Sequence, residues 1–136
     1  MAKNIYATKY QVQEILNRIF DDTTNSILDG PDILYAFANV AASQTDSSLI
    51  AAVTGKKIVV HQLLALAGGT ATTLTLNTKG AGAGTAISPL LANGANGGEV
   101  LPYSKVGWLK TTTSEALTAT TGAGSATGIL IGYSLE

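Results

Sequence analysis

His61 is the only histidine in the 136-residue chain, and histidine is the usual general base near neutral pH. It lies in the middle of the most apolar stretch, Lys57–Leu66, with no acidic neighbour in the sequence. One histidine cannot build a multi-histidine metal site, and no Ser-His-Asp set can be assigned around it. We therefore expect a hydrogen-bonded histidine in the core or at a subunit interface, with a pH-sensitive contact as the alternative.

A glycine-rich segment, Lys79–Thr85, is the stretch that could cradle a phosphate. A phosphate-binding loop of the GxxxxGK[ST] type needs its lysine after the glycines and a helix behind them. Here Lys79 precedes the glycines, their spacing departs from GxGxxG, and the residues that follow are typical of a strand. The segment is interpreted as a flexible loop between two strands.

Carboxylates could bind calcium or hydrolyse a glycosidic bond. Four aspartates follow the first apolar stretch: Asp21, Asp22, Asp29 and Asp32. They lack the spacing of an EF-hand loop, so they indicate turns, with an incidental cation as the alternative. Glu99 and Glu115 could be tried as a glycosidase pair, but such a site needs a cleft lined with aromatic residues, and the chain has one Trp, five Tyr and two Phe. The chain is therefore interpreted as a non-enzymatic protein without a metal or cofactor.

Composition excludes further classes of function. Only 12% of the residues are charged and the formal net charge is −1, so there is no basic face for a nucleic acid. The absence of cysteine removes disulfides, thiolate nucleophiles and cysteine-based zinc sites. No apolar run approaches the roughly 18 residues of a membrane span, and Met1–Tyr6 lacks the apolar core of a signal peptide. We expect a protein without nucleic-acid or membrane partners that is made in a cytoplasm.

An amphipathic helix is predicted from about Lys9 to about Phe20. Its apolar residues recur at the spacing of one helix face: Val12, Ile15, Leu16, Ile19 and Phe20. Thr8 and Gln11 match a capping box. About twelve helical residues are marginal alone in water, so this helix must pack on its own domain, a sister subunit or another protein. Residues 1–32 are assigned to an N-terminal helix and arm.

From residue 33 onward the sequence is typical of β structure. The expected strands are Leu34–Val40, Ser48–Val53, Lys57–Leu66, Thr72–Thr78, Ile87–Leu91, Glu99–Tyr103 continued by Gly107–Lys110, Leu117–Thr120 and Gly128–Leu135. The stretch Lys57–Leu66 is apolar on both faces, as in a buried central strand. Short strands separated by glycine turns at intervals of about 8–12 residues predict a mainly β, antiparallel jelly-roll β-sandwich over residues 33–136.

Two parts of the chain resemble small structural proteins of tailed bacteriophages. Glu14–Ile27 is similar to a "vLnkvFD...NaLrV" segment at the start of many of them. Ile87–Tyr103, followed by Gly107–Leu109 and Ser114–Thr118, resembles the second half of a small jelly-roll module with the pattern "l.P...GG.vlPy...gWf.t..geaL.l". That module recurs in capsid decoration proteins, head fibres and tail-fibre or spike pieces. The resemblance implies a jelly roll that assembles as a homotrimer.

The first functional hypothesis is a capsid decoration (cement) protein that binds the outer capsid surface of the virion as a trimer and stabilises the head. Anchoring to the major capsid protein is expected from Tyr10, Val12, Ile15, Leu16, Ile19 and Phe20. The trimer interface is expected to include His61, Leu63, Tyr103 and Trp108.

Two other functions stay open at this point. One is a head or tail fibre or spike component that contacts the host cell surface, with the glycine loops Lys79–Thr85 and Asn93–Gly98 facing a receptor. The other is a trimeric ligand of the TNF-like type, which the missing signal peptide disfavours.

Overall fold

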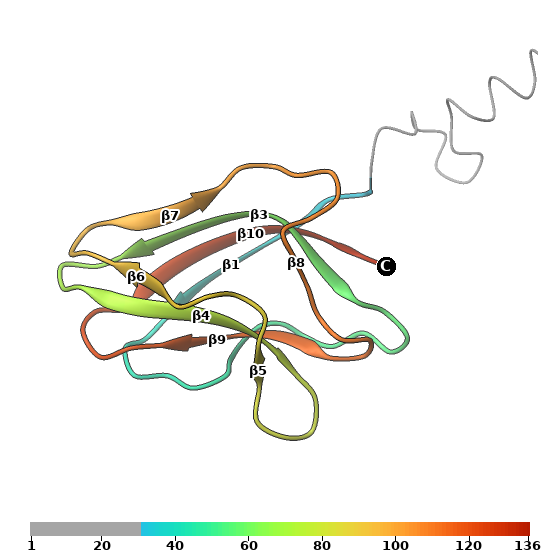
Figure 1. Ribbon diagram of the computed structural model, residues 1–136, viewed down its shortest axis with the longest axis horizontal. Coiled ribbons are helices and arrows are strands. Elements are labelled where there is room, and N and C mark those ends of the chain that lie inside the picture. Colours follow the sequence, from blue (N-terminus) through green and yellow to red (C-terminus); the bar gives the residue numbers. More distant parts are fainter. Residues whose placement is uncertain (1–30) are drawn as a thin grey trace, which may run out of the picture. The chain divides into compact units, whose positions relative to one another are not determined.

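The structure is a computed structural model that describes residues 31–136, and all regular elements in that part are β-strands (Figure 1). The strands are β1 (Leu34–Val40), β2 (Ser47–Ile50), β3 (Ile58–Ala67), β4 (Thr72–Lys79), β5 (Thr85–Ala86), β6 (Leu91–Asn93), β7 (Gly98–Leu101), β8 (Leu109–Lys110), β9 (Ala116–Thr121) and β10 (Thr127–Leu135). The predicted N-terminal helix lies outside the described residues.

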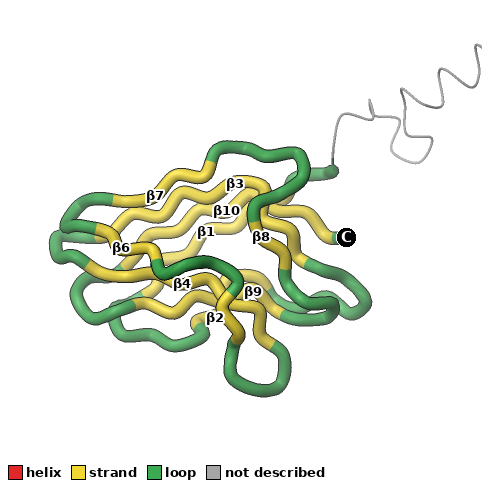
Figure 2. Tube along the Cα trace, in the orientation of Figure 1, coloured by secondary structure: helices red, strands yellow, loops and turns green. Residues whose placement is uncertain are grey.

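The strands form two antiparallel sheets. In the first sheet the order is β1-β10-β3-β7, and β8 pairs with the other end of β3. In the second sheet the order is β2-β9-β4-β5, and β6 also pairs with β4. Figure 2 shows the two sheets as separate layers of strands. The predicted mainly β fold with antiparallel sheets is confirmed, and the arrangement is sandwich-like.

A single hydrophobic core draws on both sheets. Its buried members are Val40, Ile50, Ile58, Val60, Leu63, Ala65, Leu74, Leu76, Leu117, Ala119, Ile129 and Ile131. Strand β4 contributes Leu74 and Leu76 to this core, because side chains alternate along a strand and Thr73 and Thr75 face outward. Burying one such leucine contributes about 1.5–3 kcal/mol, so the core supplies the main force that holds the two sheets together.

A β-bulge in β3 decides which of its apolar residues reach the core. Val60 lies opposite Tyr133 of β10, but Gln62 lies opposite Gly132, so His61 is the extra residue. Strict alternation along β3 would place the apolar residues before and after this point on opposite faces of the sheet. The bulge lets both groups face the core, which the sequence pattern alone does not reveal.

The strand predicted at Ile87–Leu91 is not formed, because β5 ends before it and β6 begins at its last residue. Pro89 has no N–H to donate to a neighbouring strand. Ser88 contacts β4 instead. Its hydroxyl accepts a hydrogen bond from the Leu76 N–H at 2.8 Å, and its own N–H donates to the Leu76 carbonyl at 3.3 Å. The stretch predicted as Glu99–Tyr103 continued by Gly107–Lys110 forms two separate strands, β7 and β8, with a loop between them. The other predicted strands are present, with ends that differ by a few residues.

Candidate interaction surface

His61 is buried in the first sheet, and both of its ring nitrogens are hydrogen-bonded. Nδ1 lies 2.7 Å from the carbonyl oxygen of Ser104, and Nε2 lies 2.8 Å from the hydroxyl of Ser134. Because a carbonyl oxygen can only accept, Nδ1 carries a proton, and in the neutral ring Nε2 accepts the Ser134 hydroxyl proton. His61 is therefore a satisfied core histidine, as one of the sequence interpretations predicts, with neither nitrogen free to act as a base or a metal ligand.

The loop between β7 and β8 carries two half-exposed aromatic residues, Tyr103 and Trp108. The ring of Tyr103 stacks on His61 with ring centroids 6.0 Å apart. The indole N–H of Trp108 donates to the Pro102 carbonyl at 2.7 Å, and its backbone N–H donates to the Val60 carbonyl at the same distance. These contacts hold both rings at the surface in defined orientations.

The four residues expected at a trimer interface differ in exposure. His61 and Leu63 are 1% and 2% exposed within the single chain, because the core and the β7–β8 loop already cover them. Tyr103 and Trp108 are half exposed. The trimer contact stays a prediction for all four residues.

An apolar row crosses all four main strands of the first sheet on its outer face. Phe37 of β1 lies opposite Leu130 of β10. Leu130 in turn lies opposite Leu64 of β3, and Leu64 lies opposite Val100 of β7. Residues that lie opposite one another in antiparallel strands share a face. Phe37 and Val100 are 85% and 66% exposed, so the row is most open at the two edges of the sheet.

The positions beside this row extend it into a face without formal charge. They are Tyr35, Asn39, Gln62, Leu66, Gly98, Gly128 and Gly132. We call the row and these flanking positions the uncharged face, because none of them is a carboxylate, an amine, a guanidinium or an imidazole. Tyr35 and Leu66 are exposed and add to its apolar area. Sequence reasoning found apolar residues on both sides of β3 but not this face, because the face exists only once the strand register is known.

The outer face of the second sheet is polar and is centred on Asp46. Its carboxylate accepts hydrogen bonds from the backbone N–H of Gly84 at 2.7 Å, the amide of Asn77 at 2.9 Å and the ammonium of Lys79 at 3.1 Å. The hydroxyl of Thr118 adds a longer contact at 3.3 Å. These donors, with the Gly84 N–H foremost, hold the pKa of the Asp46 carboxyl below its ordinary value.

Asp46 also explains how the glycine-rich segment is held. The segment is a loop between β4 and β5, as predicted, and Asp46 fixes its end through Gly84. A Cβ at Gly84 would overlap the Asp46 Oδ1 atom, so only glycine allows this approach. Asn77 is buried, because its amide points to Asp46 and to the Thr120 hydroxyl. Asp46 was not among the sequence candidates, since its partners lie 31 to 72 positions away.

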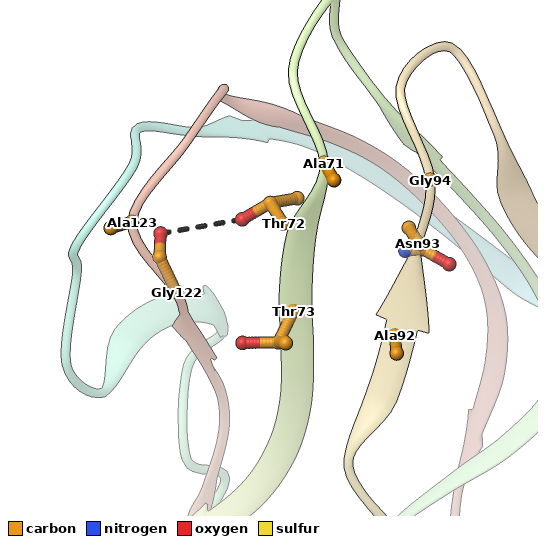
Figure 3. A pocket seen from close by; sticks show the side chains of 8 residues that line it. All are labelled: Ala71, Thr72, Thr73, Ala92, Asn93, Gly94, Gly122 and Ala123. Atoms are coloured by element: carbon orange, nitrogen blue, oxygen red, sulfur yellow. Dashed lines mark hydrogen bonds between the residues drawn. The ribbon is translucent and has the colours of Figure 1, made fainter.

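A pocket of about 400 Å³ lies at one end of the second sheet (Figure 3). It is lined by Ala71, Thr72, Thr73, Ala92, Asn93, Gly94, Gly122 and Ala123, none of which is titratable. The Thr72 hydroxyl points to the Gly122 carbonyl at 3.3 Å, whereas the buried Asn93 amide has no hydrogen-bond partner among residues 31–136. This pocket therefore offers no general acid or base.

The remaining candidate residues do not come together. Glu99 lies on β7 in the first sheet, and Glu115 lies just before β9 in the second, where it accepts a hydrogen bond from Thr78 at 2.7 Å. Within residues 31–136 no three His, Asp, Glu or Cys side chains form a group that could hold a metal. That same part has no helix with the length and hydropathy needed to cross a membrane. The predicted anchoring residues, Tyr10 to Phe20, lie outside it.

Comparison with protein-family models, with curated protein sequences and with solved structures finds no match to this chain. The function is therefore argued from the chemistry of the two outer faces.

Proposed function

We propose that the chain is a capsid decoration protein of a tailed bacteriophage, which binds the outer capsid surface as a trimer and stabilises the head. The structural observation that supports this role is the uncharged face on a domain whose described residues gather no reactive set of side chains. The centres of protein–protein interfaces are depleted in charged residues in the same way. The proposal is directed to the capsid by a resemblance to phage structural proteins, which covers Glu14–Ile27, Ile87–Tyr103, Gly107–Leu109 and Ser114–Thr118.

The fold proposed for the domain is a jelly roll. Its support is the strand order, β1-β10-β3-β7 in one sheet and β2-β9-β4-β5 in the other. Strands β1 to β4 alternate between the two sheets, and so do β8 to β10. Strand β1 lies beside β10 and β2 lies beside β9, as in the double Greek key of a jelly roll. In this interpretation β5 and β6 are two parts of one interrupted strand that pairs with β4, and β8 is a short addition to the edge of β3.

The proposed mechanism is stapling of neighbouring coat subunits. Residues 1–32 anchor each copy to the major capsid protein, and apolar area buried in that contact opposes the outward pressure of packaged DNA. Each trimer brings three anchoring segments, so modest individual contacts add up through multivalency. No bond is made or broken, and no cofactor is needed.

The alternative role, a fibre or spike component that contacts the host cell, has less support. Its receptor-facing tips are the loops 79–85 and 93–98, and a binding tip needs exposed aromatic anchors. The exposed aromatic residues of the described part lie elsewhere, on β1 and in the loop between β7 and β8: Tyr35, Phe37, Tyr103 and Trp108.

The first experiment measures the copy number of this protein per purified virion, by gel densitometry against the major coat protein. A molar ratio within a small factor of one supports surface decoration. A ratio of a few per cent or less favours the fibre or spike role. Absence from the particle would falsify both.

A second experiment tests the anchor on capsids that lack the protein. Full-length wild type and Leu16→Asp are added, and bound protein is counted after sedimentation of the capsids. The variant is expected to lose binding, because a carboxylate on the apolar side of the predicted helix cannot be buried. Asn17→Asp adds the same charge on the side of the predicted helix away from Val12 and Ile19, and is the matched control. Equal binding by both variants contradicts the anchoring role.

A further inference from the structure

The uncharged face is large for a surface that stays in contact with water. Its side chains include Phe37 and Tyr35, which are 85% and 64% exposed, and Val100, Leu66 and Leu130, which are 66%, 49% and 40% exposed. Together they present on the order of 600 Å² if each aromatic side chain counts for about 150–250 Å² and each aliphatic one for somewhat less. That is the upper end of the apolar patches on monomers, and it approaches the roughly 800 Å² that each partner contributes to a standard interface.

The edge of the same sheet is also unprotected. Within residues 31–136, β1 pairs with β10 on one side only, which leaves its other side free of a strand partner. Its seven residues include no charged residue and no proline. Proteins usually guard an edge strand with a lysine, a proline, a bulge or a short length, because a bare edge invites pairing with another chain. Within residues 31–136, β1 and the uncharged face therefore form one continuous region without protection against association.

The glycines of the uncharged face have no side chains, so they leave shallow depressions between the protruding apolar side chains. A Cβ at Gly132 would meet the side chain of Gln62, and a Cβ at Gly98 would meet that of Leu66. The side chain of Gln62 therefore packs over Gly132 of β10, and the side chain of Leu66 packs over Gly98 of β7, in the space that the glycines leave. Protruding side chains such as Phe37 alternate with these depressions on the same surface, and such a relief allows two surfaces to pack closely.

We propose that the uncharged face is the surface through which copies of this chain associate. It has no charge to offer a charged partner, whose own charges would be left unpaired when buried. A second copy brings an equally uncharged surface, with protruding side chains and depressions of the same kind. Pro102, at the start of the β7–β8 loop, lines a hollow in this face together with Val100 and Leu130, and its carbonyl accepts the indole N–H of Trp108. This inference deepens the trimer part of the proposed function and rests on it for the number of copies.

The test determines the mass of the full-length chain in solution by sedimentation equilibrium over a concentration series. Val100→Lys and Leu130→Lys each place a charge in the face. Two matched controls place the same charge at apolar residues with the same exposure elsewhere: Leu90→Lys at 66% and Val53→Lys at 39%. Far-ultraviolet circular dichroism and the urea midpoint establish that each variant is folded.

A second measurement avoids charge altogether. The natural chain has no cysteine, so Phe37→Cys and Leu90→Cys each give a protein with a single thiol. The rate of maleimide labelling is followed as the protein concentration rises. The thiol at position 37 is expected to become protected as copies associate, while the thiol at position 90 keeps its rate.

The proposal is supported if wild type exceeds the 13.8 kDa monomer and the two face variants raise the dissociation constant by about a hundredfold or more, with both controls unchanged. A wild type that stays monomeric up to about 1 mM overturns it and points to residues 1–30 or a coat protein as the cover of the face. Equal effects of face and control variants, or a position-37 thiol that is never protected, also overturn it. Association without capsid binding leaves this inference standing and removes the decoration role instead.

Discussion

The two sheets present outer faces of opposite chemistry. The first sheet carries the row from Phe37 to Val100, and its neighbours are amides, glycines and further apolar side chains. The second sheet carries hydroxyls and an amide at the equivalent places, with Thr75 opposite Thr120 and Asn77 opposite Thr118. A threonine face can remain in water, because its polar groups bond to one another, to Asp46 and to solvent. The side chains of the apolar row make no hydrogen bonds to water, so burying them against another protein surface lowers the free energy.

The same contrast recurs in how each sheet holds a loop. In the first sheet, an imidazole ring holds the loop, since His61 binds the Ser104 carbonyl of the β7–β8 loop. In the second sheet, an ion does it, since the Asp46 carboxylate binds the Gly84 N–H of the β4–β5 loop. Hydrogen bonds to a charged group contribute more than neutral ones, so the polar face is expected to react more strongly to the loss of its central residue.

The largest expected effect comes from Asp46→Ala, which removes the acceptor of three close donors. We expect a loss of about 3 kcal/mol in the free energy of unfolding, because each hydrogen bond to a charged group contributes about 1.5–3 kcal/mol and the three are not additive. Urea unfolding followed by circular dichroism measures it. Asp32→Ala, at an exposed aspartate, is the control and should change stability by less than about 0.5 kcal/mol. Similar losses in both variants would contradict the role of Asp46.

A smaller effect is expected for Ser134→Ala in the first sheet. It leaves the buried Nε2 of His61 without a partner, which costs about 1–2 kcal/mol. Trp108, the only tryptophan, reports the unfolding of this region by its fluorescence. Ser104→Ala is the matched control, because Ser104 binds His61 through its backbone carbonyl, which alanine retains. If the two variants lose the same stability, the hydroxyl bond to His61 is not what stabilises the loop.

Acid should remove the part of the Asp46 contribution to stability that depends on its lowered pKa. The unfolded chain titrates at the ordinary pKa of 3.8 and the folded chain at a lower pKa, so the unfolded state binds more protons between these values. The contribution is therefore fully present above pH 3.8 and is lost as the pH falls through the lowered pKa. Glu136, whose pKa Lys110 also lowers, is half exposed and adds less.

The measurement is a series of urea midpoints for wild type and Asp46→Asn from about pH 2 to pH 6, which spans the carboxyl range. The variant is expected to show a flatter acid limb, since it has no proton to take up at this position. An acid limb of the same steepness in both proteins would show that other carboxyls cause it.

The sequence predicts local structure well and the two outer faces poorly. Leu34–Val40 was predicted with the bounds that β1 has, because its apolar run is flanked by turn residues. The interruption at Pro89 was predictable from the missing N–H, although the pattern was interpreted as one strand. The bulge at His61 leaves no mark in composition or alternation, since it arises from the register between β3 and β10.

The surface chemistry depended on pairings between distant residues. Leu64 and Leu130 look like ordinary strand residues until the register places them side by side with Phe37. Asp46 looks like a turn aspartate until the fold brings Gly84 to it. A single sequence does not give the register of non-consecutive strands, so these two sites could not be predicted from it.

The smallest effects on the folded monomer are expected from exchanging one residue between the faces. Thr75→Val makes the hydroxyl face more apolar, and Leu64→Thr makes the apolar row more polar, both at half-buried positions of central strands. Each should change the free energy of unfolding of the monomer by no more than about 0.5–1 kcal/mol, because neither side chain belongs to the core.

The two variants should differ in how the urea midpoint depends on protein concentration. Association stabilises the folded state by mass action, so the midpoint of an associating protein rises with concentration. Wild type and Thr75→Val should both show this rise, and Leu64→Thr should show a weaker one. If Leu64→Thr keeps the full rise, the row from Phe37 to Val100 is not the contact between copies, and the contrast between the two faces has another origin.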